Sequence, residues 1–234
     1  MANKLQETLR SLSELAEKHE EITVAFSAGK DSLAVMELCS RTFKKVSAFY
    51  FFVVPDLEVT NRYMRLARDR WNIKVAEYPS DGFCMALKTG LYCNPSEAFA
   101  NYEERNLKTV YAQSLYVTTG NITGLVATGM KAADGLKRRQ FFANIDPANG
   151  GDPFWSQVHH PLKRWNKQEV LDFLKDCDIP IPPTAKGTIT TGVGFAHDEL
   201  CFLHDQYPDD FDKMEKLFPY IRSTIYRRKY HGVE

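Results

Sequence analysis

The stretch Phe26-Ser27-Ala28-Gly29-Lys30-Asp31-Ser32 decides how the rest of the chain is interpreted. Residues 22–26 form a short, apolar, β-branched segment, which predicts a buried parallel strand. Residues 33–39 carry apolar side chains three to four positions apart, which predicts a helix. A strand that enters a helix through Ser, Ala and Gly leaves backbone N–H groups free at the positive end of the helix dipole. The sequence therefore predicts a phosphate site in this turn.

The side chains of the turn suit an anion as well. Gly29 allows the backbone to approach a ligand, and Lys30 adds a mobile cation. Ser27 and Ser32 add hydroxyl donors. Two common phosphate loops do not fit, because Lys30 follows a single glycine and precedes Asp31, and no G-x-G-x-x-G fingerprint is present.

The string S-A-G-K-D-S at residues 27–32 resembles the PP-loop, S-x-G-K-D-S, of the N-type ATP pyrophosphatases. In that superfamily the loop holds the pyrophosphate of ATP while the α-phosphate is attacked, which yields an adenylylated substrate. A polar turn with an ordinary helix cap is the alternative. We favour it less, because every specified position of the motif matches between a well-defined strand and a well-defined helix.

The composition is that of one α/β domain, or of one domain with a small extension. Of the 234 residues 44% are hydrophobic and 26% are charged, which suits a packed core and not a disordered chain. Thirty basic residues balance thirty acidic ones, so the overall charge predicts no nucleic-acid partner, although a local patch remains possible. We find no signal-peptide pattern and no apolar run of membrane-spanning length. We therefore expect a soluble, cytoplasmic protein without a membrane partner.

The cysteine pattern predicts free thiols that serve mainly as packing residues. There are five cysteines and no C-x-x-C motif, which excludes the common metal and redox arrangements. The cysteines are Cys39, Cys84, Cys93, Cys177 and Cys201.

Helical and strand patterns alternate through the first part of the chain. We expect helices at residues 3–20, 33–43 and 55–71, and strands at 22–26, 46–54 and 73–78. This rhythm favours right-handed crossovers. The expected fold class is α/β, a parallel sheet with helices on both faces.

The later part of the chain is less regular. We expect a helix at about residues 96–117, a buried strand at 125–129 and an extended piece that ends at His160. Asn166 predicts an N-cap for a helix from Lys167 to Asp176, with Glu169 completing an approximate capping box. The expected organisation is a nucleotide-binding domain at residues 1–195 and a helical C-terminal extension at 196–234 that packs on the same domain.

Three motifs in order resemble the phosphoadenosine phosphosulfate (PAPS) reductase branch of the PP-loop superfamily, which includes the small subunit of ATP sulfurylase and DNA-phosphorothioation enzymes. The first is the loop at 27–32. The second, Gly129-Met130-Lys131-Ala132-Ala133-Asp134-Gly135-Leu136-Lys137-Arg138, is similar to G-x-R-x-x-E-S-x-x-R. The third, His160-Pro161-Leu162 with Trp165, is similar to H-P-L-x-x-W. The resemblance covers about residues 20 to 195 and implies an adenine nucleotide alpha hydrolase-like fold.

The resemblance implies a site at the carboxyl ends of the strands, with ATP and Mg²⁺ as cofactors. Catalytic roles fall to Lys30, Asp31, Lys131 and Arg138, and Asp31 is the candidate magnesium ligand. Nucleotide-binding roles fall to Ala25, Phe26, Ser27, Gly29, Lys30, Ser32, Phe51, Gly129, Lys137, Arg139 and His160. A solvated basic loop is the alternative for Arg139, and a structural role is the alternative for His160.

The departures from the PAPS reductases are specific. Those enzymes generally lack the loop lysine and carry a nucleophilic cysteine in a C-terminal E-C-G-x-H, whereas residues 229–234 contain no cysteine. The cysteines that hold an iron–sulfur cluster in adenylylsulfate reductases are missing at residues 191–194. Phe51-Phe52-Val53 replaces the D-T-G that commonly follows strand two, and Asp56 and Glu58 lie close enough in sequence to substitute.

These features favour an ATP pyrophosphatase that adenylylates an unidentified acceptor. The alternatives are a sulfonucleotide reductase, whose thiol would have to be Cys201 or come from another protein, and a nucleotide-binding subunit. A protein partner or a homo-oligomer stays open. We expect residues 184–194, rich in Thr and Gly, to close over the site, and the tail from Arg222 to offer a local patch for an anionic partner such as nucleic acid.

Overall fold

The computed structural model describes residues 2–146, 153–183 and 193–231. Its centre is a five-stranded sheet in which every pair of neighbours is parallel, in the order β3-β2-β1-β4-β5. The strands are β1 (Glu21–Ala25), β2 (Lys45–Phe52), β3 (Val75–Pro79), β4 (Val126–Ala127) and β5 (Val158–His159). The expected α/β fold class is confirmed.

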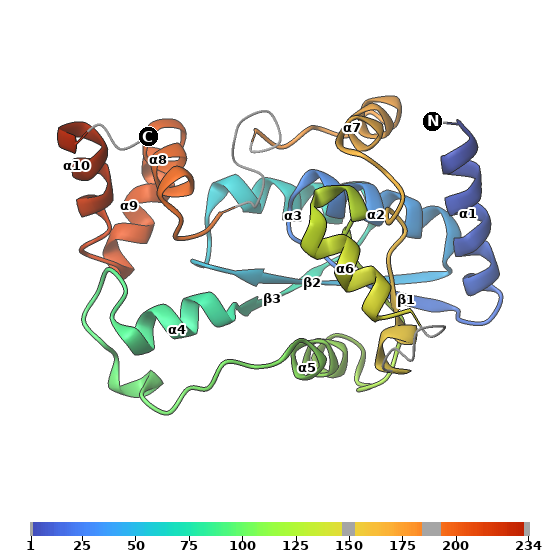
Figure 1. Cartoon of the computed structure of the whole chain (residues 1–234), viewed down its shortest axis with the longest axis horizontal. Coiled ribbons are helices and arrows are strands. Elements are labelled where there is room, and N and C mark those ends of the chain that lie inside the picture. The colour runs from blue at the N-terminus through green and yellow to red at the C-terminus, as the bar shows by residue number, and fades with distance from the viewer. Residues whose placement is uncertain (1, 147–152, 184–192, 232–234) are drawn as a thin grey trace.

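Helices cover both faces of the sheet, as Figure 1 shows. The helices α1 (Ala2–Ala16), α2 (Lys30–Thr42), α3 (Glu58–Trp71) and α7 (Lys167–Asp176) lie above it in that view. Below it lie α4 (Asp81–Thr89) and α5 (Leu107–Thr119). The remaining described elements are α6 (Leu136–Asn144), α8 (His197–Gln206), α9 (Pro208–Leu217), α10 (Arg222–His231) and the short 3₁₀ helices η1 (Glu97–Phe99), η2 (Ala132–Asp134) and η4 (Pro153–Gln157).

Alternation along the strands divides the core between the two faces. Ile22 and Val24 of β1 belong to the large cluster that includes Leu33 of α2. On the other face, Phe49 of β2 packs in a much smaller cluster with Leu115 of α5. The hydrophobic core above the sheet is therefore much larger than the core below it.

The strand order places the PP-loop at a topological switch point. After β1 the chain crosses to β2 and β3 on one side, and then returns to β4 and β5 on the other side. Val24 and Ala127 are register partners, so the carboxyl ends of β1 and β4 lie next to each other. Ligands of open α/β sheets bind at such a point.

The C-terminal helices share a core with the chain that follows β2. Val54 and Leu57 are buried together with residues of α8, α9 and α10, such as Leu200 and Phe211. The carboxylate of Asp210, which is 1% exposed, accepts hydrogen bonds of 2.8 Å from the backbone N–H groups of residues 58 and 59 at the start of α3. Helices α8 to α10 therefore sit beyond the carboxyl ends of β2 and β3 (Figure 1).

The segment between β3 and β4 differs from the expected single helix at 96–117. Helix α4 begins one residue after Ser80, whose hydroxyl accepts from the Phe83 N–H at 3.0 Å, and it ends at Gly90 with a φ of 74°. Helix α5 begins only at Leu107, because the Asn106 side chain caps it by accepting from the backbone N–H of residue 109 at 3.0 Å. These caps divide the segment into two helices.

Other local expectations are confirmed. Helix α7 has the expected bounds, and Asn166 and Glu169 form a reciprocal capping box with bonds of 2.9 and 2.8 Å. No helix in the described part of the chain is long and apolar enough to cross a membrane. Most of the segment at 184–194, expected to act as a lid, lies outside the described residues.

Candidate functional site

The PP-loop begins where β1 ends and finishes at the first turn of α2. Ala28 has a φ of 57°, a left-handed conformation that turns the chain sharply into the helix. Gly29 is the N-cap residue, and no side chain caps the helix start there. The first N–H groups of an α-helix have no partner inside the helix. The loop therefore presents backbone donors to an anion at the positive end of α2.

The polar side chains of the loop interact with one another. The Ser27 hydroxyl donates to Ser32 Oγ at 3.2 Å, and the Ser32 hydroxyl donates to the Gly29 carbonyl at 3.0 Å. Lys30 Nζ donates to Asp31 Oδ2 at 2.6 Å. These contacts hold the predicted residues in one compact group, with Ser27 exposed to solvent.

Gly129, directly after β4, touches the backbone of this loop. A Cβ on Gly129 would lie 2.9 Å from Asp31 Cβ, 3.1 Å from the Asp31 carbonyl carbon and 3.2 Å from Ser32 N. Real Cβ atoms essentially never show a contact below 3.0 Å, and contacts of 3.1 and 3.2 Å are tighter than nine in ten. Glycine is required at position 129 because the second motif packs directly against the first.

The side chain of Lys131, in the second motif, contacts Asp31 of the PP-loop. This lysine side chain is 1% exposed, and its Nζ lies 2.7 Å from Asp31 Oδ1 and 3.1 Å from Asp134 Oδ1. Although the charges are paired, Lys131 Nζ and Asp31 Oδ1 are buried atoms without a hydrogen bond of normal geometry among the described residues. Buried polar groups normally have hydrogen-bond partners, and exceptions often mark functional sites. The pair leaves hydrogen-bonding capacity beside the helix start.

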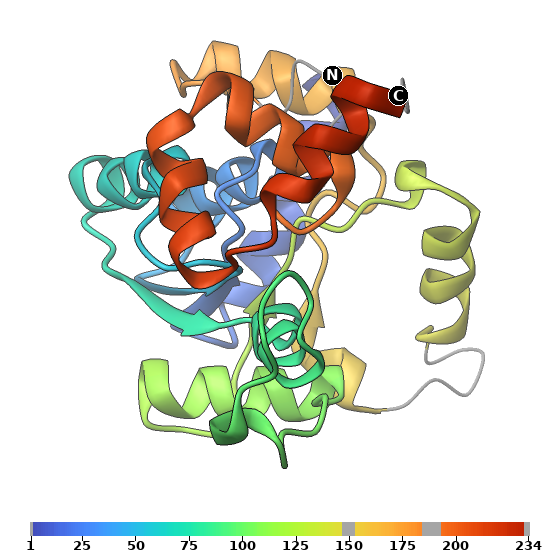
Figure 2. The same cartoon turned by 90° about the vertical axis from the view of Figure 1, so that its left-hand side faces the viewer.

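Arg138 approaches the same edge from α6. Its Nη1 lies 2.9 Å from Met130 Sδ, and its charge lowers the pKa of His160 and opposes the effect of burial, which raises the pKa of Tyr111. Lys137 and Arg139 are exposed. Phe142 is the buried residue of α6, and the helix stands out from the body of the molecule (Figure 2). Arg138 is exposed like its two basic neighbours, and its contact with Met130 of the second motif distinguishes it from them.

His160 lies on the other side of β4. Its Nδ1 is 2.7 Å from Thr128 Oγ1, and its ring packs against Phe142 at 5.0 Å between centroids. Burial lowers the pKa of His160 to about 4, with the neighbouring His159, Lys163 and Arg138 acting in the same direction. The imidazole is therefore neutral at pH 7, and its buried Nε2 has no partner among the described residues.

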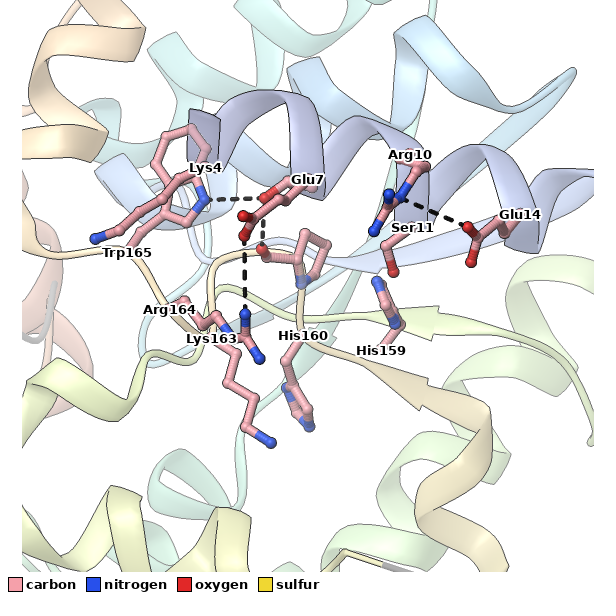
Figure 3. A pocket seen from close by; sticks show the side chains of 12 residues that line it. Lys4, Glu7, Arg10, Ser11, Glu14, His159, His160, Lys163, Arg164 and Trp165 are labelled. Carbon is pink, nitrogen blue, oxygen red and sulfur yellow. Dashed lines mark hydrogen bonds and ion pairs between the residues drawn. The ribbon is translucent and has the colours of Figure 1, made fainter. Parts of the chain in front are cut away.

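His160 also borders a groove of about 490 Å³ between α1 and residues 159–165 (Figure 3). In that view His160 and Lys163 extend away from α1. The basic side chains nearer α1 are paired with carboxylates: Lys4 with Glu169 at 2.7 Å, Arg164 with Glu7 at 3.7 Å and Arg10 with Glu14 at 3.8 Å. Because these charges are matched, the groove does not resemble a second phosphate site.

The apolar residues assigned nucleotide-binding roles, Ala25, Phe26 and Phe51, occupy different faces of the sheet. Phe26 is 2% exposed and belongs to the large core, so only its backbone is available to a ligand. Ala25 and Phe51 lie on the α5 face, where the Phe51 ring is 5.3 Å from Phe49 and 6.1 Å from Tyr78. This thin aromatic layer offers apolar surface at the carboxyl ends of β1 and β2.

Two residues that sequence reasoning missed lie beside the loop. Thr60 and Tyr63 of α3 line a small hollow together with Ser27 and Gly29, and the Tyr63 hydroxyl has no partner among the described residues. Their signal in the sequence is weak, because a buried threonine and tyrosine on an amphipathic helix are typical of packing. Asp56 and Glu58, expected to replace the D-T-G of the family, instead interact with Asn61 and Arg65.

The described residues fit a nucleotide phosphate better than a protein-built metal cage. No group of three or more His, Cys, Asp or Glu side chains suitable for a metal occurs in the described ranges. Both oxygens of Asp31 already lie within 2.7 Å of a lysine ammonium, Oδ2 beside Lys30 and Oδ1 beside Lys131. A magnesium ion at Asp31 would have to displace one of these lysines, whereas Mg²⁺ held mainly by phosphate oxygens needs few protein ligands.

Burial outweighs the polar contacts of the cysteine thiols, although Cys201 Sγ lies 3.7 Å from His197 Nε2 and Cys177 Sγ lies 3.2 Å from Arg41 Nη2. Four of the five are buried and Cys177 is half-buried. Burial raises the pKa of each of them above its ordinary value. Nucleophilic cysteines have lowered pKa values and accessible sulfur atoms.

A parallel sheet with an uncapped helix start at its switch point and the buried Lys131 beside it defines a nucleotide-binding α/β protein. Residues 21–192 match the model of the phosphoadenosine phosphosulfate reductase domain, and the chain belongs to this family, within the PP-loop superfamily. No curated protein sequence matches the chain.

Two solved structures are similar in outline. One is phosphoadenylyl-sulfate (PAPS) reductase from Candida auris in a phosphate complex, with 16% identity, a TM-score of 0.49 and coverage of 80% of this chain and 87% of that one. The other is NH₃-dependent NAD synthetase from Campylobacter jejuni subsp. jejuni NCTC 11168 in complex with nitrate, with 12% identity, a TM-score of 0.48 and coverage of 100% and 96%. Both scores are below 0.5, so the family assignment rests on the domain match.

Proposed function

We propose that the chain is an ATP pyrophosphatase that cleaves ATP into pyrophosphate and an adenylylated acceptor. The observation that carries the proposal is the buried pair of Lys131 and Asp31, packed through Gly129 against the start of α2. A phosphate bound at the helix start can accept a charge-assisted hydrogen bond from Lys131, whose Nζ otherwise lacks one. The same phosphate receives the backbone N–H groups of the loop.

Each residue of the site has a role in this reaction. Cleavage of a phosphoanhydride places negative charge on the non-bridging oxygens and on the departing pyrophosphate. The N–H groups of the loop and the hydroxyls of Ser27 and Ser32 bind that pyrophosphate. Lys30 and Lys131 neutralise its charge, and Arg138 contacts a phosphate from the α6 side. Mg²⁺ bound with the nucleotide would supply further neutralisation of the phosphate charge.

The family name supports a second candidate, a sulfonucleotide reductase. That chemistry requires a nucleophilic thiol. Cys201, the candidate nearest the C-terminus, is 6% exposed, and burial raises its pKa. The reductase would therefore depend on a thiol from another protein, whereas Lys30 supports the pyrophosphatase from within the loop.

A nucleotide panel distinguishes the candidates. We would measure binding of ATP and PAPS by calorimetry, pyrophosphate release from ATP with a cell extract as the source of acceptor, and thioredoxin-dependent sulfite release from PAPS. The pyrophosphatase proposal expects ATP binding and pyrophosphate release that both fall in Lys30→Ala and persist in Lys74→Ala, since Lys74 is exposed at the amino end of β3. Sulfite release that Cys201→Ser abolishes would establish the reductase instead. Tight ATP binding without any product would indicate a nucleotide-binding subunit.

A further inference from the structure

The outward face of α10 combines exposed aromatic rings with positive charge. Tyr226 and Tyr230 are 53% and 69% exposed, and their ring centroids lie 6.4 Å apart with 38° between the planes. Arg227 and Lys229 are exposed beside them. Residues three and four positions apart share one side of a helix, so Tyr226, Arg227 and Tyr230 form a continuous stripe with Lys229 at its border. We call these four residues the α10 stripe.

The charges of the α10 stripe are not neutralised within the described part of the chain. Helix α10 contains no acidic residue. Two of its other cations are paired: Arg222 donates to Glu215, and Arg228 donates to both oxygens of Asp205 at 2.7 and 2.8 Å. Arg227 and Lys229 form no ion pair with a described residue, although Lys229 Nζ lies 5.5 Å from the centroid of the Tyr230 ring.

The inward face of α10 is committed to packing. Thr224 and Ile225 of α10 are buried, as is Ile221 just before the helix, and the two isoleucines belong to the core that joins α8, α9 and the chain after β2. The helix therefore presents the stripe from a fixed support. Exposed tyrosines contribute nothing to that core, so packing does not explain them.

We propose that the α10 stripe binds single-stranded nucleic acid. Unpaired bases stack on exposed aromatic rings, and the neighbouring phosphates are neutralised by Arg and Lys. A duplex hides the faces of its bases, and an acidic protein segment has no need of two adjacent exposed rings, so a single strand matches the complete set of groups. The net charge of the chain is zero, which makes this local cluster, and not a global field, the source of attraction.

The position of the α10 stripe relates it to the nucleotide site without depending on the proposed function. Helices α8 to α10 lie beyond the carboxyl ends of β2 and β3, at the edge of the sheet that carries the PP-loop (Figure 1). Single-stranded nucleic acid bound to α10 would therefore lie beyond the carboxyl ends of β2 and β3.

The test is fluorescence anisotropy with a labelled single strand of about 20 nucleotides, its duplex and an RNA of the same sequence, at about 50 and about 200 mM KCl. The full-length wild type is expected to bind the single strands more tightly than the duplex. Changing both tyrosines, as Tyr226→Ala with Tyr230→Ala, should weaken binding at least about tenfold, whereas the two Phe substitutions should retain it. Removing both cations, as Arg227→Ala with Lys229→Ala, should reduce the slope of log affinity against log salt by about 1.4.

Matched variants separate the stripe from general effects. The pair Lys18→Ala and Lys74→Ala removes two exposed cations at the amino edge of the sheet, and Tyr116→Ala removes an exposed ring on α5; both should bind as wild type does. Lys30→Ala should bind single-stranded nucleic acid as the wild type does, even though we expect it to lose ATP affinity. A failure of the proposed ATP chemistry is therefore distinguishable from a failure of this proposal. Circular dichroism checks folding, and Tyr226→Gln with Tyr230→Gln gives a second form of the aromatic test. Absence of single-strand binding at the lower salt, or equal binding when both rings are lost, overturns the proposal.

Discussion

Substitution of Gly129 by alanine tests the contact between the two motifs most sharply. The new Cβ would lie 2.9 to 3.2 Å from three atoms of residues 31 and 32, two of which belong to the backbone of the loop. Backbone atoms cannot rotate away as the tip of a side chain can, so the exit of β4 or the start of α2 must shift. Overpacking of this kind costs about 1–3 kcal/mol of the free energy of unfolding.

The same shift should weaken nucleotide binding. The N–H groups at the start of α2 must point at the phosphate to bind it, and loss of that alignment is expected to reduce ATP affinity at least about tenfold, or about 1.4 kcal/mol. Urea unfolding followed by circular dichroism measures the stability, and calorimetry with ATP and Mg²⁺ measures the affinity.

Gly124→Ala is the matched control at the other end of β4. Its Cβ would lie 3.4 Å from Leu115 Cδ2, a flexible side-chain atom, at an ordinary van der Waals distance. We expect wild-type affinity and a stability change below about 1 kcal/mol. If Gly129→Ala binds ATP as tightly as wild type and is equally stable, β4 does not press on the loop and the reasoning about the site is wrong.

Four further predictions concern charge, acidity, thiols and the C-terminal helices. Lys30→Ala should lower ATP affinity or turnover at least about tenfold, about 1.4 kcal/mol, with an unchanged circular dichroism spectrum; an unchanged rate would remove the PP-loop from the mechanism. Because the pKa of His160 is about 4 when folded and 6.5 ordinarily, the unfolded state takes up the proton first, so stability falls as pH falls through that window. We expect wild type to lose about 2 kcal/mol more than His160→Gln between pH 7 and pH 5 in urea unfolding, and parallel curves would contradict this. Cys201→Ser and Cys177→Ser should leave ATP binding and pyrophosphate release unchanged, and loss of either activity would give a thiol a role in the chemistry. Asp210→Ala should cost about 1–2 kcal/mol in thermal or urea unfolding, because α3 loses its cap, whereas equal stability would show that the bonds to residues 58 and 59 contribute little.

Much of the fold could be predicted from short sequence patterns. The bounds of α7 were predictable because its capping box is written in four consecutive residues, from Asn166 to Glu169. Helix α4 was not predicted, because Gly82 and Gly90 are unfavourable in a helix interior, although Ser80 caps its start and Gly90 ends it. The sequence contains both caps of α4, but the two glycines made the segment a weak helix candidate.

The arrangement of the site was only partly predictable. The shape of the PP-loop depends on consecutive residues, whereas the contact of Gly129 with Asp31 depends on the pairing of β1 with β4, which no local pattern encodes. The burial of Phe26 follows from strand alternation, since it continues the face of Ile22 and Val24, so its side chain could have been excluded from the list of ligand contacts. Arg138 was assigned its role from its place in the second motif, whereas helix α6, which carries it, was not predicted.

The most direct test of the central claim follows the γ-phosphate of ATP. The protein is incubated with Mg²⁺, γ-labelled ATP and a cell extract as the source of acceptor, and labelled pyrophosphate is separated from labelled orthophosphate, with extract alone as the blank. We predict that the wild type releases the label as intact pyrophosphate, and that Lys131→Met, which removes the buried ammonium beside Asp31, does not. Label that appears as orthophosphate together with ADP, or equal release of pyrophosphate by wild type and Lys131→Met, would contradict the account.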